Sequence, residues 1–130
     1  MNRRYYHNFI EIYNKLLSFY GNQNWWPGDT RDEIIIGAVL TQSTNWINVE
    51  KAIQNLKQKE FLTLQSILDS DISDLEQMIK PSGFYTIKAK RLKSVAMTVL
   101  SSNIEAMTLK ESRNLLLKTY GIGEETADCI

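Results

Sequence analysis

The stretch Tyr120-Gly-Ile-Gly-Glu-Glu-Thr-Ala-Asp-Cys-Ile130 closes the sequence and gives the clearest indication of its fold. Residues 109–119 favour a helix that leads into a Gly-x-Gly turn, after which a second helix is expected to begin at once. Gly121 and Gly123 permit a positive φ, which other residues resist. They also leave main-chain amides uncovered beside a helix N-terminus, where the partial positive charge favours an anion such as phosphate.

The chain stops at Ile130 within the expected second helix, and no cap or helix breaker precedes the end. We therefore expect a sequence that is truncated at its C-terminus. Its 130 residues suffice for one domain with a buried core, and 43% apolar and 23% charged residues are typical of a globular protein.

Composition excludes several classes of protein. No apolar run approaches the roughly 20 residues that span a bilayer, and the N-terminus lacks a signal-peptide core. The single cysteine, Cys129, cannot form an internal disulfide and cannot alone hold a zinc or iron–sulfur site. We expect no membrane partner and a reducing, cytoplasmic location.

Charge is unevenly distributed although the net charge is zero. Residues 60–79 carry five acidic and no basic residues, whereas residues 80–118 carry eight Lys and Arg against two Glu, a local charge of +6. A basic third of a neutral chain is consistent with a nucleic-acid interface, although charge alone favours solvated helix faces.

Apolar residues recur at three- and four-residue steps, and no stretch alternates with period two, so we predict an all-α protein. Three Ser/Thr-x-x-Glu patterns predict helix starts with a capping box. They are Thr30/Glu33, Ser73/Glu76 and Thr108/Glu111. The expected helices span about residues 3–19, 31–41, 46–58, 62–68, 73–79, 84–101 and 109–120, and one more follows the Gly-x-Gly turn.

The pattern of apolar residues also predicts which helix faces are buried. Residues 31–41 are apolar nearly all round and should form the central buried helix. Residues 3–19 should bury one face, with Tyr6, Phe9, Ile10, Tyr13, Leu16 and Leu17. Residues 84–101 should bury Ile87, Leu92, Val95, Ala96, Val99 and Leu100, with the Lys/Arg cluster outside.

Two polar or aromatic positions near helix ends are candidate DNA contacts. Gln42-Ser-Thr-Asn45 follows the apolar helix; it suits a surface turn with Thr44 or Asn45 as N-cap, or a Gln42 that projects into a duplex. Phe84 follows the Pro-Ser-Gly turn; an aromatic residue there is usually core, but an exposed one can act as a wedge between base steps.

The three tryptophans stand beside loops: Trp25 and Trp26, followed by Pro27, and then Trp46. Buried tryptophans mostly fill a core. Grouped near loops, they can instead form an aromatic slot for a nucleobase, above all a cationic alkylated one, since an aromatic face attracts cations.

Three motifs in one register resemble the endonuclease III superfamily of helix-hairpin-helix DNA glycosylases. They are Val39-Leu-Thr-Gln42, Gly83-Phe-Tyr-Thr-Ile-Lys-Ala89 and Tyr120-Gly-Ile-Gly-Glu-Glu-Thr-Ala127, and the resemblance covers about residues 30–130. With Trp25, Trp26, Pro27 and Trp46, the chain is most similar to the branch that contains bacterial 3-methyladenine DNA glycosylases.

The resemblance implies a fold. It is the all-α endonuclease III-like glycosylase fold, here one domain, 1–130, with the N-terminal helix and most of the six-helix barrel. The helix-hairpin-helix would occupy about residues 109–130 and be incomplete.

The resemblance also implies roles for particular residues. Gln42 would fill the gap left by an extruded base, and Phe84 would part the opposite strand. The amides of Gly121, Ile122 and Gly123, with a bound monovalent cation, would hold DNA phosphate. Trp25, Trp26, Pro27 and Trp46 would form the pocket for the flipped base.

Two departures from the family pattern limit the chemistry. Where bifunctional members have a Schiff-base lysine, this chain has Glu125, which cannot form an imine. The aspartate that assists water in monofunctional members would lie beyond the hairpin, outside this sequence, and Asp128 is a poor substitute. Cysteines for an iron–sulfur cluster would also lie downstream, so we expect no such cofactor in this chain.

The expected function is base-excision DNA repair in the bacterial cytoplasm, at the nucleoid. A monofunctional glycosylase would remove a damaged base, an alkylated purine, by base flipping, and would act as a monomer on double-stranded DNA with a damaged base or abasic site. The alternative is a catalytically inactive module that only holds DNA through the hairpin. For the chain as given, which lacks the catalytic aspartate, we expect no catalysis.

Overall fold

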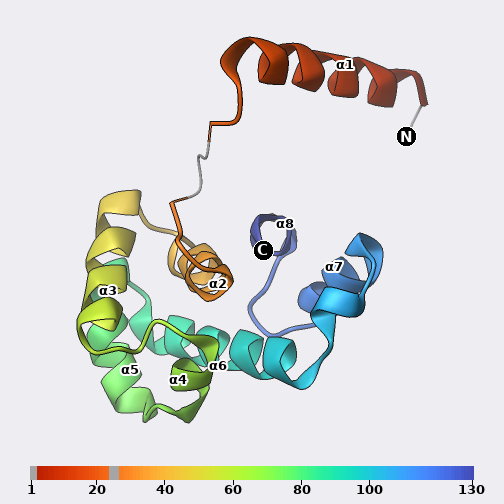
Figure 1. Cartoon of the computed structure of the whole chain (residues 1–130). Coiled ribbons are helices and arrows are strands. Elements are labelled where there is room, and N and C mark those ends of the chain that lie inside the picture. Colours follow the sequence, from red (N-terminus) through yellow and green to blue (C-terminus); the bar gives the residue numbers. More distant parts are fainter. Residues whose placement is uncertain (1–2, 24–26) are drawn as a thin grey trace.

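The computed structural model describes residues 3–23 and 27–130, with side chains from residue 8 onward, and the described ranges contain helices and no strand (Figure 1). None of the described helices is both long and apolar enough to cross a membrane. The helices are α1 (Arg3–Tyr20), α2 (Arg31–Leu40), α3 (Trp46–Gln58), α4 (Leu64–Asp69), α5 (Ile72–Ile79), α6 (Tyr85–Ser101), α7 (Leu109–Leu117) and α8 (Glu124–Cys129), with 3₁₀ turns η1 (Lys80–Ser82) and η2 (Ile104–Ala106).

Helix α2 is buried along most of its length, as the sequence predicts, although α6 contacts more elements. Helix α2 packs against α3, α6 and α8, while α4 and α5 pack on α6. Ile36, Val39 and Leu40 have no exposed surface, and only Ile34 of the apolar run is half-buried. Each fully buried aliphatic side chain contributes about 1.5–3 kcal/mol, so α2 anchors the core on which the loops at its ends are mounted.

The capping predictions have mixed outcomes. At α7 the full capping box of Thr108 and Glu111 is confirmed. At α2 the Thr30 hydroxyl accepts from the Glu33 amide, but the Glu33 carboxylate turns away to the Asp29 amide.

The capping box predicted at Ser73 is wrong. Helix α5 begins earlier, at Ile72, because the Asp71 carboxylate caps it by accepting from the Ser73 amide at 2.8 Å. Aspartate is at least as good an N-cap as serine, so the earlier acidic residue fixes the start of the helix.

The buried face predicted for residues 3–19 is exposed from residue 8 onward, and the Tyr6 side chain of that face lies outside the described residues. Figure 1 shows α1 apart from the other helices, so nothing in the described part of the chain covers it. The exposed apolar residues of α1 are Phe9, Ile10, Ile12, Tyr13, Leu16, Leu17, Phe19 and Tyr20.

Expectations for four of residues 84–101 are also wrong. Ile87 and Leu100 are 42% and 40% exposed, whereas Lys88 is buried, with 1% exposure. Lys88 precedes Leu92 by four residues and Val95 by seven, so it lies on the core-facing side of α6. Lys93 is half-buried, and its ammonium donates to the carbonyls of Ile67, Leu68 and Ser70 at the end of α4.

Candidate nucleic-acid interface

Gln42 lies in the α2–α3 loop and contacts the hairpin. Its side-chain amide donates to the Gly121 carbonyl and to the Thr126 hydroxyl, both at 3.0 Å, and its oxygen accepts from the Arg91 guanidinium at 2.7 Å. The loop is not a simple surface turn, although Asn45 does cap α3 by accepting from the Asn48 amide. Entry of Gln42 into a duplex would require these three bonds to exchange for bonds to DNA.

The hairpin between α7 and α8 has the geometry that glycine permits. Gly121 has φ of +77°, and a Cβ there would lie 2.2 Å from Cγ of Arg91. The Arg91 side chain therefore covers Gly121 while its terminal nitrogen holds Gln42. Gly123 has an ordinary φ of −90°, and a Cβ there would meet no atom within 4 Å. Ile122, between them, is 5% exposed and anchors the hairpin in the core.

Phe84 is exposed, so it does not belong to the core. Its side chain is 65% exposed, and its backbone lies in the left-handed region with φ of +45°. Gly83 before it also has a positive φ, of +71°. Two successive residues with positive φ turn the chain sharply, and the Phe84 ring is exposed to solvent at the start of α6.

Replacement of Phe84 by glycine should stabilise the fold. A left-handed conformation costs a non-glycine residue roughly 1–2 kcal/mol, so F84G should raise the free energy of unfolding by about 1 kcal/mol in urea titration. The matched control is I47G, because Ile47 is equally exposed, at 64%, but lies within α3. Glycine inside a helix costs about 1 kcal/mol, so I47G should lower the free energy of unfolding. An F84G variant as destabilised as I47G would contradict the strain at Phe84.

Lys88 joins the two loops that carry Gln42 and Phe84. Its ammonium donates to the Leu40 carbonyl at 2.8 Å and to the Ser82 carbonyl at 2.7 Å. Burial, and to a smaller extent the charge of Arg91, lowers the pKa of Lys88 from 10.5 to about 8. The lysine therefore stays mostly protonated at neutral pH in a place where its charge is poorly solvated.

Pro27 and Trp46 line one pocket, between the segment that precedes α2 and the exposed side of α3. Trp25 and Trp26 lie outside the described residues. The Trp46 indole donates to the Glu50 carboxylate at 2.9 Å. Carboxylates outnumber cations in the lining, which contains Asp29, Glu33, Glu50 and Lys57. Lys57 forms an ion pair with Glu33 at 3.0 Å, and the hydrogen bond to that carboxylate raises the pKa of Lys57.

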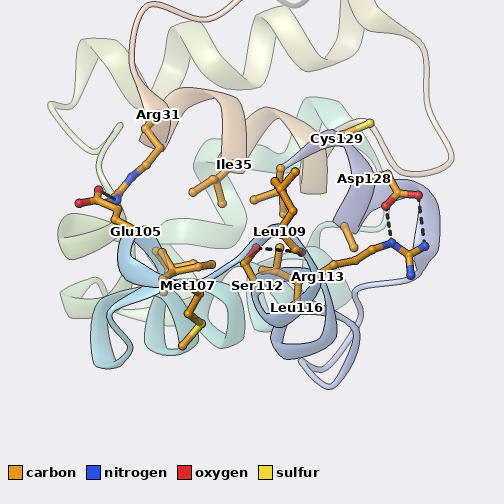
Figure 2. Close-up of a pocket in the computed structure, with 14 residues that line it drawn as sticks. Arg31, Ile35, Glu105, Met107, Leu109, Ser112, Arg113, Leu116, Asp128 and Cys129 are labelled. Carbon is orange, nitrogen blue, oxygen red and sulfur yellow. Dashed lines mark hydrogen bonds and ion pairs between the residues drawn. The ribbon is translucent and has the colours of Figure 1, made fainter. Parts of the chain in front are cut away.

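A second, mainly apolar groove lies between α2, α7 and α8, with an ion pair at each side (Figure 2). Arg31 pairs with Glu105, and Arg113 pairs with Asp128. The Arg113 hydrogen bond lowers the pKa of Asp128, while burial and nearby carboxylates raise that of the Cys129 thiol. An ion-paired aspartate and a protonated thiol make a poor base and a poor nucleophile, so this groove has no evident chemistry.

Residues 36–126 match the family described as HhH-GPD superfamily base excision DNA repair protein. The chain belongs to this superfamily. Among HhH-GPD proteins, the chain is 46% identical over 127 residues to the Methanocaldococcus jannaschii protein named "Putative DNA repair glycosylase MJ1434", covering 92% of this chain and 58% of that protein. It is 31% identical over 97 residues to endonuclease III of Thermotoga maritima, covering 75% of this chain and 44% of that enzyme.

Solved HhH-GPD structures confirm the fold. The H. pylori 3-methyladenine DNA glycosylase MagIII, bound to 1,N6-ethenoadenine, is 34% identical and superposes with a TM-score of 0.74, covering 92% of this chain and 61% of that one. A non-covalent endonuclease III–DNA complex superposes with a TM-score of 0.69 at 20% identity, which shows the fold alone; it covers 93% of this chain and 56% of that one. The chain thus spans about three-fifths of the length of MagIII and of the M. jannaschii relative.

Two residues that hold the Gln42 loop in place were not among the candidates predicted from the sequence. Arg91 holds Gln42 and covers Gly121, and Lys88 spans two loops. The signal for Lys88 was its helical phase with Leu92 and Val95. No comparable signal marks Arg91, since its partners lie 49 residues upstream and in the hairpin.

Proposed function

We propose that the protein acts in base-excision repair as a monofunctional DNA glycosylase that removes an alkylated purine by base flipping. The observation that carries the proposal is the meeting of distant motifs: Gln42 is hydrogen-bonded to the hairpin, and Lys88 joins the Gln42 loop to the Phe84 turn. A filling residue, a wedge and a phosphate-binding hairpin on one side of the molecule are the parts that base extrusion requires.

The pocket of Pro27 and Trp46 supports an alkylated purine as substrate. N-alkylation leaves a purine with a positive charge, which an indole face and a carboxylate-rich lining both favour. The 3-methyladenine activity named for the H. pylori relative agrees with this chemistry. In this proposal Trp25 and Trp26 complete the pocket.

The proposal excludes strand cleavage through a lysine Schiff base. Glu125 is exposed in the first turn of α8, at the position of the family's nucleophilic lysine, and a carboxylate forms no imine. Asp128 is engaged by Arg113, so it is a poor candidate for the carboxylate that assists water. Double-stranded DNA with a damaged base or abasic site is the proposed partner, bound by a monomer.

No iron–sulfur ligand set exists in the sequence, since Cys129 is its only cysteine. The described residues also contain no group of three His, Cys, Asp or Glu side chains that could hold a metal ion. A monovalent cation at the hairpin would therefore be bound by main-chain carbonyl oxygens.

The full-length gene product should release bases from methylated duplex DNA and leave abasic sites. Strand breaks should appear only after heat or alkali, because base removal alone leaves the backbone intact. Unmethylated duplex is the control, and borohydride should trap no covalent complex. Breaks without heat or alkali would contradict the monofunctional proposal.

The second candidate is a module that binds DNA without chemistry. The described residues favour it to this extent: Glu125 stands where bifunctional members have a lysine, and the Asp128 carboxylate is held by Arg113. Both candidates require affinity for abasic-site duplex that falls steeply with salt, because phosphate contacts release counterions. Affinity that does not change with salt would contradict both.

A further inference from the structure

Lys88 lies between the two elements that the proposed function inserts into DNA. One of its side-chain bonds ends on Leu40, two residues before Gln42, and the other ends on Ser82, two residues before Phe84. Leu40 is the last residue of α2, whose C-terminal carbonyls lack partners within the helix. A single ammonium therefore connects the start of the Gln42 loop to the start of the Phe84 turn.

The chemistry of the site explains why a lysine occupies it. The ammonium has three donors on a long side chain, and it faces the negative end of the α2 dipole. Its bonds go to carbonyl oxygens, and among the described residues no carboxylate forms an ion pair with it. Replacement of a buried charge by an apolar residue is often neutral or stabilising, so stability alone does not account for a lysine at this position.

The turn that Lys88 holds is strained. Phe84 has φ of +45° and ψ of +33°, the left-handed conformation, which persists in a non-glycine residue only where its surroundings fix it. The Lys88 side chain fixes the start of the turn by binding the Ser82 carbonyl, while the helical main-chain bond from the Lys88 amide to the Phe84 carbonyl, at 2.9 Å, fixes its end. The direction of the exposed Phe84 ring thus depends on Lys88.

We propose that Lys88 is a positioning residue that fixes the Gln42 loop and the Phe84 turn relative to each other, so that both side chains enter one DNA lesion together. This inference rests on the proposed function and adds a residue to it. Lys88 is buried and touches no DNA; it acts through the two residues that do.

Lys93 provides a matched control on the same helix. Its ammonium also donates only to main-chain carbonyls, those of Ile67, Leu68 and Ser70. These carbonyls end α4, which carries none of the residues assigned to DNA. The variants K88M and K93M therefore remove the same kind of interaction, and only K88M removes it beneath the inserting residues.

The experiment compares binding of wild type, K88M and K93M to two duplexes, one intact and one with a tetrahydrofuran abasic analogue. Fluorescence anisotropy gives the preference for the abasic duplex, and 2-aminopurine opposite the analogue reports unstacking by the wedge. A displacement of about 1 Å can cost up to roughly a hundredfold in a positioned site, so K88M should lose about tenfold or more of the preference, and most of the 2-aminopurine signal. Its affinity for intact duplex should stay within about twofold, because phosphate contacts remain.

The outcomes separate the two proposals. Wild-type preference that K88M retains would overturn the role of Lys88 and leave the proposed function standing. If K88M and K93M lost the same amount of preference for the abasic duplex, Lys88 would be a merely structural residue, and its proposed positioning role would also be overturned. A wild type without preference for the abasic duplex would contradict the proposed function, and the role of Lys88 with it.

A second variant, K88Q, keeps the test decisive if K88M does not fold. Its amide retains a donor on a shorter side chain and can reach one carbonyl but not both. K88Q should bind intact duplex as wild type does and lose part of the abasic preference and of the 2-aminopurine signal. Wild-type values for both readouts in K88Q would overturn the proposal.

Discussion

Replacement of Gly121 by alanine should destabilise the fold strongly, whereas the same replacement at Gly123 should not. At Gly121 the new Cβ would lie 2.2, 2.5 and 2.6 Å from Cγ, Cδ and Nε of Arg91, and alanine would have to hold φ at +77°. Displacement of Arg91 also takes away the guanidinium that binds Gln42. Positive φ alone costs a non-glycine residue on the order of 1–3 kcal/mol, so we expect G121A to lose about 2 kcal/mol or more in urea unfolding.

G123A is the control for this prediction. The added Cβ meets no atom within 4 Å, and Gly123 already has the extended conformation of an N-cap. Its free energy of unfolding should therefore fall by no more than about 1 kcal/mol, the loss typical when alanine replaces a better N-cap residue. If the hairpin amides hold phosphate, however, the methyl group stands where the phosphate approaches, and affinity for abasic duplex should fall in anisotropy. Equal stability losses in the two variants would contradict the tight approach of Arg91 to Gly121.

The helical core could be predicted from sequence because its signal is local. The continuous apolar run of α2 leaves no face suited to solvent, and Ile36, Val39 and Leu40 are indeed fully buried. The capping box of Thr108 and Glu111 depends on atoms three residues apart and is confirmed. The predicted start of α5 is wrong because Asp71 and Ser73 both suit an N-cap, and the sequence pattern alone cannot decide between them.

Long-range contacts account for the other errors. The basic cluster of α6 was expected to face solvent, yet Lys88 finds two carbonyls, one of them 48 residues upstream. The apolar face of α1 was expected to be buried because periodicity predicts a buried face without naming what covers it. In the same way the sequence selected Gln42 and Gly121 separately, and only the fold shows that the Gln42 amide binds the Gly121 carbonyl.

The stability of the protein should rise with pH between about 8 and 10.5 because of Lys88. Its pKa is lowered to about 8 in the folded state, against 10.5 for an ordinary lysine. Within this window the unfolded chain binds a proton at Lys88 that the folded chain does not, so raising the pH favours folding. Each pKa unit corresponds to 1.36 kcal/mol, so the Lys88 contribution should reach about 3 kcal/mol at the upper end of the window.

Urea unfolding of wild type and K88M across this window measures the contribution. Other groups titrate there too, such as Cys129, whose raised pKa acts in the opposite direction, but they do so in both proteins and cancel in the difference. The wild-type curve should therefore rise relative to that of K88M as the pH increases. Parallel curves would mean that Lys88 has an ordinary pKa and a hydrated ammonium. A rising difference would show that, at neutral pH, the fold retains a charge that opposes its own stability, as expected if Lys88 was selected for positioning the Gln42 loop and the Phe84 turn.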